Sequence, residues 1–228
     1  MGALWKAPAR GLLALGVHPN VMTIIGTAGV LFGALFFFPR GDIWLFWGVM
    51  VVTFFVVTDM LDGTMARLGN KSSRLGAFLD STLDRVADAA IFGALAWSFV
   101  DVSRPTAAAA IVCLILGFLV PYARAKAESI GVEAKGGFAQ RSDRLVLGLT
   151  ATGLVGLGLP VGLLTWTLWL LSLLAALTFG QRIYSVVKAA RLDPEWNKDL
   201  NVRAEHEPLA RHAHRFGRRS VGLVHAVI

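Results

Sequence analysis

The chain has 228 residues, of which 55% are hydrophobic and only 16% are charged, and its mean hydropathy is +0.62. This balance is too apolar for an ordinary soluble domain and predicts an all-α integral membrane protein. The formal net charge is +7, but the basic residues lie between apolar runs, which argues against a nucleic-acid partner and favours membrane topology and anionic substrates. Cys113 is the single cysteine, which excludes an intrachain disulfide.

The segment 1–19 precedes the first long apolar run and carries Lys6 and Arg10. On a helical projection these two cations share one side and large apolar side chains share the other. This arrangement predicts an amphipathic helix that lies in the membrane interface. The residues around Pro19 should then break the chain, with Asn20 or Thr23 capping the helix that follows.

Six apolar segments of membrane-spanning length follow, separated by polar or proline-containing turns. They cover Val21–Phe38, about Ile43–Asp59, a stretch beginning near Gly76, Thr106–Tyr122, Leu145–Leu159 and Val161–Ile183. In the first of them Gly29 and Gly33 are four residues apart, which permits close packing against another helix. The expected organisation is an interfacial helix at 1–19, a six-helix membrane domain at 20–191 and a basic cytoplasmic tail at 192–228.

The distribution of lysine and arginine predicts the orientation. The loops after the first and third segments hold only Arg40 and Arg104, and the other side of the membrane collects most of the remaining basic residues. By the positive-inside rule, both termini face the cytoplasm of a multi-pass protein in the cell membrane.

Four carboxylates lie where the second and third segments meet the same membrane face. Asp59 and Asp62 are three residues apart and Asp80 and Asp84 are four apart, so each pair shares one helix face. An ionised side chain at mid-membrane costs roughly 2.5–3.5 kcal/mol on insertion scales, so the set needs a compensating partner. Oxygen-only ligands favour Mg²⁺, Mn²⁺ or Ca²⁺ over Zn²⁺. Solvated helix ends are the alternative interpretation of either pair alone.

These residues belong to a longer pattern that resembles a family signature. Eight residues match the spacing of the CDP-alcohol phosphotransferases: Asp59, Asp62, Gly63, Ala66, Arg67, Gly76, Asp80 and Asp84. The resemblance covers the chain to about Arg191. It implies two Mg²⁺ ions per active site, with Mn²⁺ as the alternative, one held by Asp59, Asp62 and Asp80 and the other by Asp59, Asp80 and Asp84. It also implies that Asp84 is the general base and that the protein is a homodimer.

The same resemblance implies a set of contacts to CDP-diacylglycerol: Asn20, Val21, Met22, Thr23, Gly63, Ala66, Arg67 and Ser73. Several of these residues would also suit a purely structural role. Gly63 and Ala66 would allow tight helix packing, and Arg67 would serve as a topological anchor. Helix capping would account for Asn20, Thr23 and Ser73.

A second basic cluster predicts a phosphate on the acceptor alcohol: Arg124, Lys126, Arg141, Arg144 and Arg182. The surrounding sequence resembles the actinobacterial phosphatidylinositol-phosphate synthases, and this implies that Arg124, Arg144 and Arg182 hold inositol phosphate. Topology alone is the competing interpretation. Asp88 continues the aspartate row by one turn and is interpreted as a partner behind the site or a structural pair with Arg85.

The functional hypothesis is a membrane enzyme that moves the phosphatidyl group of CDP-diacylglycerol to 1D-myo-inositol 3-phosphate and releases CMP. Within that class, glycerol 3-phosphate is the alternative acceptor, which would give phosphatidylglycerol phosphate. From other classes, the acidic cluster would also suit a divalent-cation channel or transporter, and a non-catalytic lipid-binding scaffold would bind CDP-diacylglycerol without releasing CMP.

Overall fold

The computed structural model describes residues 18–68, 73–134, 137 and 140–192. Within this part of the chain the regular structure is entirely helical, which confirms the all-α prediction. The chain forms two compact units, Met1–Arg182 and Ile183–Ile228, and the described part of the second unit is residues 183–192. The predicted interfacial helix and nearly all of the predicted basic tail lie outside the described residues.

The helices follow one another in chain order as α2 (Pro19–Phe32), the short turns η1 (Gly33–Phe37) and η2 (Phe38–Arg40), α3 (Asp42–Leu68), α4 (Arg74–Phe99), α5 (Arg104–Ser129), α6 (Arg141–Gly156) and α7 (Val161–Leu192). Among the described residues, three stretches are long and apolar enough to cross a membrane: Asn20–Arg40, Arg104–Ser129 and Val161–Leu192. The apolar part of α3, Asp42–Thr58, is shorter. A multi-pass membrane protein is therefore indicated, while the six-span topology stays a prediction.

The start of α2 corrects one local prediction. Its N-cap is His18, whose Nδ1 accepts a hydrogen bond from the Asn20 backbone N–H at 3.3 Å. Pro19 occupies the first turn, where its missing N–H removes no helical hydrogen bond. The expectation that Asn20 or Thr23 would cap this helix is wrong, because the cap falls before the proline and leaves both residues inside the helix.

Close contact between α2 and α3 depends on the two glycines. A β-carbon at Gly29 would overlap the Phe55 ring, and one at Gly33 would lie 2.9 Å from Val52 Cγ2. Small residues let two membrane helices approach until their side chains interlock, which is how helices associate where burial from water provides little drive. The prediction of close packing at this glycine pair is confirmed.

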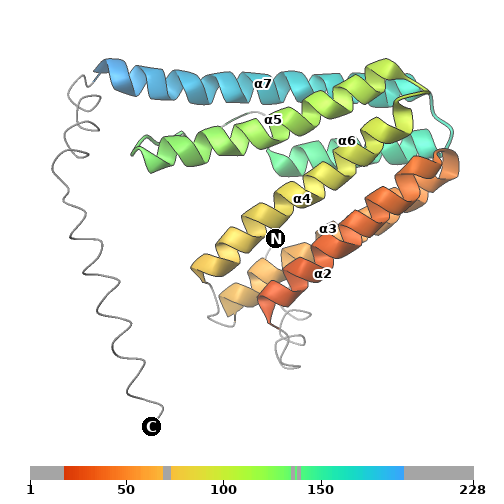
Figure 1. Ribbon diagram of the computed structural model, residues 1–228, viewed down its shortest axis with the longest axis horizontal. Coiled ribbons are helices and arrows are strands. Elements are labelled where there is room, and N and C mark those ends of the chain that lie inside the picture. Colours follow the sequence, from red (N-terminus) through yellow and green to blue (C-terminus); the bar gives the residue numbers. More distant parts are fainter. Residues whose placement is uncertain (1–17, 69–72, 135–136, 138–139, 193–228) are drawn as a thin grey trace, which may run out of the picture. The chain divides into compact units, whose positions relative to one another are not determined.

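Helix α4 is central in the first unit, where it contacts α2 and α5, while α3 contacts α2 and α6 (Figure 1). The buried side chains of α4 include Ile91, Phe92 and Leu95, each no more than 1% exposed.

The contact of α5 with α7 is partly polar. Thr106 Oγ1 lies 2.7 Å from Thr165 Oγ1, and Cys113 Sγ lies 3.3 Å from the Leu168 carbonyl oxygen.

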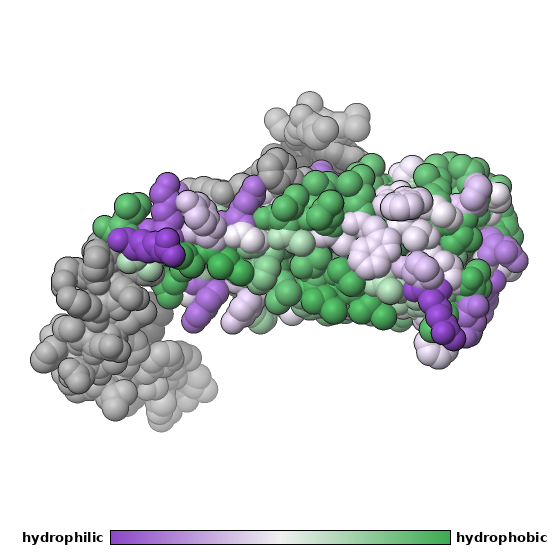
Figure 2. All heavy atoms as spheres, turned by 90° about the horizontal axis from the view of Figure 1, so that it is seen from above, coloured by the Kyte–Doolittle hydropathy of each residue, from purple (hydrophilic) through white to green (hydrophobic). Residues whose placement is uncertain are grey.

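The outer surface of these helices is apolar. On the face displayed in Figure 2, hydrophobic side chains cover the middle of the helices and hydrophilic side chains gather toward the ends. Five tryptophans are exposed near the start of α3, the end of α4 and the start of α7: Trp44, Trp47, Trp97, Trp166 and Trp169. Tryptophan is enriched where helices leave the hydrocarbon core. This end is opposite to the one that carries the predicted carboxylate and arginine sites.

Candidate active site

Helix α4 carries a row of carboxylates, Asp80, Asp84 and Asp88, which lie on one face because they are four residues apart. Enclosure increases along the row. Asp80 is exposed, the Asp84 side chain is 19% exposed and the Asp88 side chain is 1% exposed. Ser73 is the N-cap of α4 and accepts a hydrogen bond from the Gly76 N–H at 2.9 Å, so the capping interpretation of Ser73 is confirmed.

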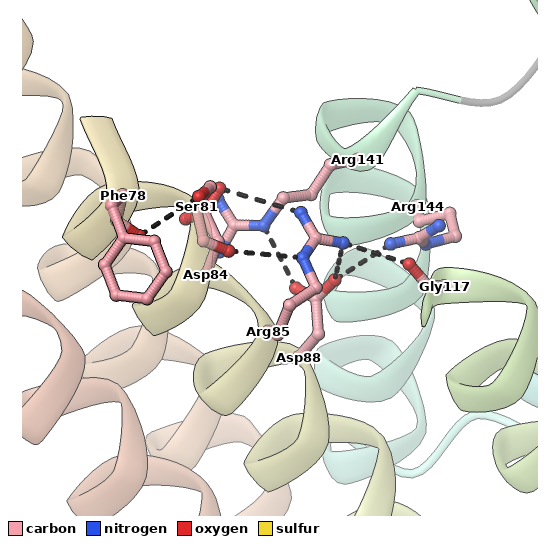
Figure 3. A network of polar contacts seen from close by, with 8 residues as sticks. All are labelled: Phe78, Ser81, Asp84, Arg85, Asp88, Gly117, Arg141 and Arg144. Carbon is pink, nitrogen blue, oxygen red and sulfur yellow. Dashed lines mark hydrogen bonds and ion pairs between the residues drawn. The ribbon is translucent and has the colours of Figure 1, made fainter. Parts of the chain in front are cut away.

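Two arginines from the first turn of α6 meet this row (Figure 3). Arg141 lies between two carboxylates, with Nη1 2.7 Å from Asp84 Oδ1 and Nε 3.0 Å from Asp88 Oδ1. Arg144 Nη2 donates to Asp88 Oδ2 at 2.9 Å, and both side chains of that pair are almost fully buried. A capping box formed by Gln140 and Asp143 begins α6 at this point and thereby places both arginines toward α4.

A third arginine reaches the same carboxylates from α4 itself. Arg85 Nη1 lies 3.6 Å from Asp88 Oδ2 and donates to the Gly117 carbonyl oxygen at 2.9 Å. That carbonyl is available because Pro121, four residues further along α5, has no N–H to donate to it. The predicted pairing of Asp88 with Arg85 is confirmed, but the shorter contacts of Asp88 come from α6.

The arginines line a cavity of about 270 Å³, which lies between α4, α5, α6 and α7. Its charged lining residues are Arg85, Arg124, Arg141, Arg144 and Arg182. Arg182 Nη1 donates to the Val120 carbonyl oxygen, and Arg124 Nε donates to Glu128 Oε1 at 2.8 Å. Arg144 Nε is buried and has no hydrogen-bond partner within the described part of the chain. Four of the five residues predicted to bind the acceptor phosphate therefore lie at one cavity, whereas Lys126 is exposed and does not line it.

A larger, mostly apolar groove of about 760 Å³ runs between α3 and α6. Its walls are aliphatic and aromatic side chains such as Phe46, Val49 and Leu149. Asp80, Asp84 and Arg141 also line it, so the groove leads from an apolar surface to the carboxylates. Arg141 lines both hollows and thus separates the apolar groove from the arginine-lined cavity.

The predicted nucleotide contacts are only partly described. A β-carbon at Gly76 would lie 3.1 Å from Ser73 Oγ and 3.2 Å from Asn20 Oδ1, so these three residues are neighbours. Val21 is exposed, and Met22 and Thr23 are buried in the first turns of α2. Helix α3 extends to Leu68. The side chains on its last turns, those of Asp59, Asp62, Gly63, Ala66 and Arg67, lie outside the described residues.

The chemistry of the described donors fits a hard divalent cation. Asp80 and Asp84 supply carboxylate oxygens to the groove, and its described lining residues include no histidine or cysteine. Among the described side chains there is no group of three or more candidate ligands. Because Asp59 and Asp62 lie outside that set, the four-carboxylate site stays a prediction.

Comparison with known proteins agrees with this geometry. The model of the CDP-alcohol phosphatidyltransferase family matches residues 16–180. The chain belongs to this family. The match covers the aspartate row of α4 and the arginines of α5 and α6, and it ends before Arg182 of α7.

Curated members of the family resemble this chain closely. The phosphatidylinositol phosphate synthase of Streptomyces avermitilis is 45% identical over 187 residues, which is 78% of this chain and 75% of that protein. The phosphatidylinositol phosphate synthase of Mycolicibacterium smegmatis is 40% identical over 189 residues, or 80% of this chain and 83% of that protein.

Solved structures give the same result. The crystal structure of Mycobacterium tuberculosis phosphatidylinositol phosphate synthase with CDP-DAG bound has a TM-score of 0.74 and 39% identity, and the match covers 80% of this chain and 92% of that one. The same enzyme in complex with manganese and citrate also gives a TM-score of 0.74 at 39% identity, covering 80% and 88%.

The family's aspartate signature does not reveal all of this site. Arg85, Gln140 and Thr178 line the cavity but were absent from the predicted acceptor contacts. Pro121 is the one sequence signal that points to such a contact, because a proline within a helix frees a carbonyl oxygen one turn earlier for another donor.

Proposed function

We propose that this chain transfers the phosphatidyl group of CDP-diacylglycerol to 1D-myo-inositol 3-phosphate, giving phosphatidylinositol phosphate and CMP. The observation that carries the proposal is the arginine-lined cavity beside the aspartate row, joined to it by the 2.7 Å contact between Arg141 and Asp84. The family membership and the names of the similar enzymes support the same reaction.

The charge of the cavity matches a phosphorylated acceptor. Among the described residues, five arginines line it, and three carboxylates, those of Asp84, Asp88 and Glu128, form ion pairs with members of this set. The positive charges of this group therefore exceed the negative ones by two. A phosphate monoester carries about −1.5 to −2 charges at neutral pH. Inositol phosphate and glycerol 3-phosphate both meet this requirement, whereas free inositol does not.

The apolar groove suits the lipid part of the donor. Its aliphatic lining on α3 and α6 would contact acyl chains, and the pyrophosphate would lie near Asp80 and Asp84, which line the same groove. The nucleotide would then lie toward the first turns of α2 and α4, near Asn20 and Ser73, with Gly63, Ala66 and Arg67 of α3 as further contacts.

Two divalent cations, Mg²⁺ or Mn²⁺, would be held by Asp59, Asp62, Asp80 and Asp84. When bound, they would neutralise the pyrophosphate and stabilise the attacking and leaving oxygens. The manganese complex of the similar tuberculosis enzyme supports a requirement for a divalent metal.

The side chains then have separate tasks. The arginines fix the acceptor through its phosphate, and Asp84 accepts the proton of the acceptor hydroxyl as that oxygen bonds to the β-phosphorus. The bond between that phosphorus and the oxygen bridging to CMP breaks, and CMP leaves. Arg141, shared by the cavity and Asp84, sets the distance between the bound acceptor and its base.

The proposal includes the topology. Six membrane helices at 20–191 would follow an interfacial helix at 1–19 and precede a basic tail at 192–228. The exposed tryptophans at one end and the arginine cavity at the other support a cytoplasmic active site with both termini on the same side. We assign the protein to the cell membrane as a homodimer.

The test compares three acceptors with purified protein, CDP-diacylglycerol and Mg²⁺. CMP release is expected with inositol 3-phosphate and not with free inositol, because only the phosphate satisfies the arginines. Faster turnover with glycerol 3-phosphate would instead assign a phosphatidylglycerol phosphate synthase, and no CMP release with any acceptor would refute the enzymatic proposal.

A further inference from the structure

Asp88 is the most enclosed carboxylate of the α4 row. Its side chain is 1% exposed, and it lines neither the arginine cavity nor the apolar groove, although its three arginine partners all line the cavity. A buried carboxylate is costly unless charge-assisted hydrogen bonds compensate it. Asp88 has such bonds from Arg141 and Arg144, each at 3.0 Å or less.

These bonds fix the two guanidinium groups from a position outside the cavity lining. Arg141 uses Nε on Asp88 and Nη1 on Asp84, and Arg144 uses Nη2 on Asp88 (Figure 3). A guanidinium group is planar and presents five N–H donors in a fixed fork, so fixing one or two of them fixes the direction of the rest. Arg144 Nε, buried and without a hydrogen-bond partner among the described residues, is one of the remaining donors.

We infer that Asp88 is a positioning residue for the acceptor: it orients Arg141 and Arg144 so that their remaining donors meet the acceptor phosphate. The inference rests on the proposed function and adds to it a residue that lies outside the family's aspartate signature. Asp88 acts through the arginines and does not touch the substrate.

An orienting role and a purely electrostatic role of Asp88 predict opposite effects of its neutralisation on phosphate binding, so the two roles can be distinguished. If Asp88 served only as a counter-charge, its neutralisation would leave the cavity more positive and would tighten phosphate binding. If it orients the arginines, its loss lets the two guanidinium groups turn away, and phosphate binding weakens. In metal sites, loss of a residue that orients a ligand through a hydrogen bond typically lowers the affinity by about 10- to 100-fold, and we expect an effect of the same order here.

The first variant is Asp88→Asn, assayed for CMP release while each substrate is varied. We expect the KM for inositol 3-phosphate to rise by about tenfold or more, with the KM for CDP-diacylglycerol within about twofold. Binding of inositol 3-phosphate, measured by calorimetry without CDP-diacylglycerol, should weaken to the same extent. The destabilised control is Thr106→Val, which removes a fully buried hydroxyl between α5 and α7, far from the cavity.

The second variant, Gly117→Ala, changes no charge and keeps Asp88. The added β-carbon would lie 3.2 Å from Arg144 Nη2, the atom that bonds to Asp88, and 3.3 Å from Arg144 Cζ. Since the guanidinium must shift by a few tenths of an ångström, the KM for the acceptor should rise by about threefold or more if orientation matters. Gly93→Ala is the matched control, because a β-carbon there meets no atom within 4 Å.

Three results would overturn the inference. Unchanged or tighter phosphate binding in Asp88→Asn would show a counter-charge only. Equal losses for both substrates, reproduced by Thr106→Val, would show a structural role. If Asp88→Asn does not fold, the Gly117→Ala variant provides the test. An acceptor KM that is as little changed in Gly117→Ala as in Gly93→Ala would then show that the orientation of Arg144 does not affect acceptor binding. Wild-type protein that releases no CMP would instead refute the proposed function.

Discussion

Replacing Asp84 with asparagine should lower the rate of CMP release by about 10³-fold or more. The neutral amide cannot accept the acceptor proton, and the loss of a general base alone costs about 10²- to 10⁴-fold. The variant also removes one of the predicted metal ligands and the carboxylate that pairs with Arg141 at 2.7 Å. The measurement is the initial rate of CMP release at saturating CDP-diacylglycerol and inositol 3-phosphate.

The matched control for this variant is Asp101→Asn, which makes the same chemical change in the turn between α4 and α5. It should retain the wild-type rate. An Asp84→Asn protein that folds and keeps more than about a tenth of the wild-type rate would contradict the role of Asp84 as base, since that role implies a larger loss.

Replacing Arg144 with alanine should raise the KM for inositol 3-phosphate by about 10- to 150-fold. A hydrogen bond to a charged group contributes about 1.5–3 kcal/mol, and 1.4 kcal/mol corresponds to a factor of about ten. Arg144 is 2% exposed and its Nε has no partner among the described residues, so water does not replace it readily. Arg144→Lys should lie between alanine and wild type, because lysine keeps the charge but lacks the planar fork.

The KM for CDP-diacylglycerol should change by no more than about twofold in Arg144→Ala, since no nucleotide contact is assigned to this side chain and independent sites contribute separately. Arg104→Gln at the opposite end of α5 is the control for loss of a basic side chain. An unchanged acceptor KM, or equal increases for both substrates, would show that the cavity does not bind the acceptor phosphate.

Local patterns predicted most of the helices. Apolar runs bounded by turns located the starts of α2, α5, α6 and α7 to within about four residues, but α5 and α7 continue well beyond the ends of the predicted segments. The four-residue spacing of Gly29 and Gly33 predicted close packing of this segment but not that α3 would be its partner. The cap of α2 was not predicted, because histidine is not a common N-cap and the choice depends on how Pro19 enters the first turn. Length and apolarity single out only three membrane-crossing stretches in the described part of the chain, because charged residues such as Asp84, Arg85 and Asp88 interrupt α4 and because α6 has only 16 residues.

The aspartate spacing predicted the shared face of α4, since helical periodicity is local. The partners of Asp88 could not be derived in this way. Arg141 and Arg144 are 53 and 56 residues away, and which arginine reaches which carboxylate depends on how α6 packs beside α4. The exposure of Lys126 could not be derived from the sequence either, because it also depends on how the helices pack. Lys126 lies in the last turn of α5 and does not line the cavity.

The proposed two-metal site is tested most directly by locating manganese by anomalous scattering in crystals grown with Mn²⁺ and CDP-diacylglycerol. Two peaks about 3.5–4 Å apart are expected, bounded by carboxylate oxygens of Asp59, Asp62, Asp80 and Asp84. A single peak away from Asp80 and Asp84, or α3 carboxylates directed away from those of α4, would contradict it.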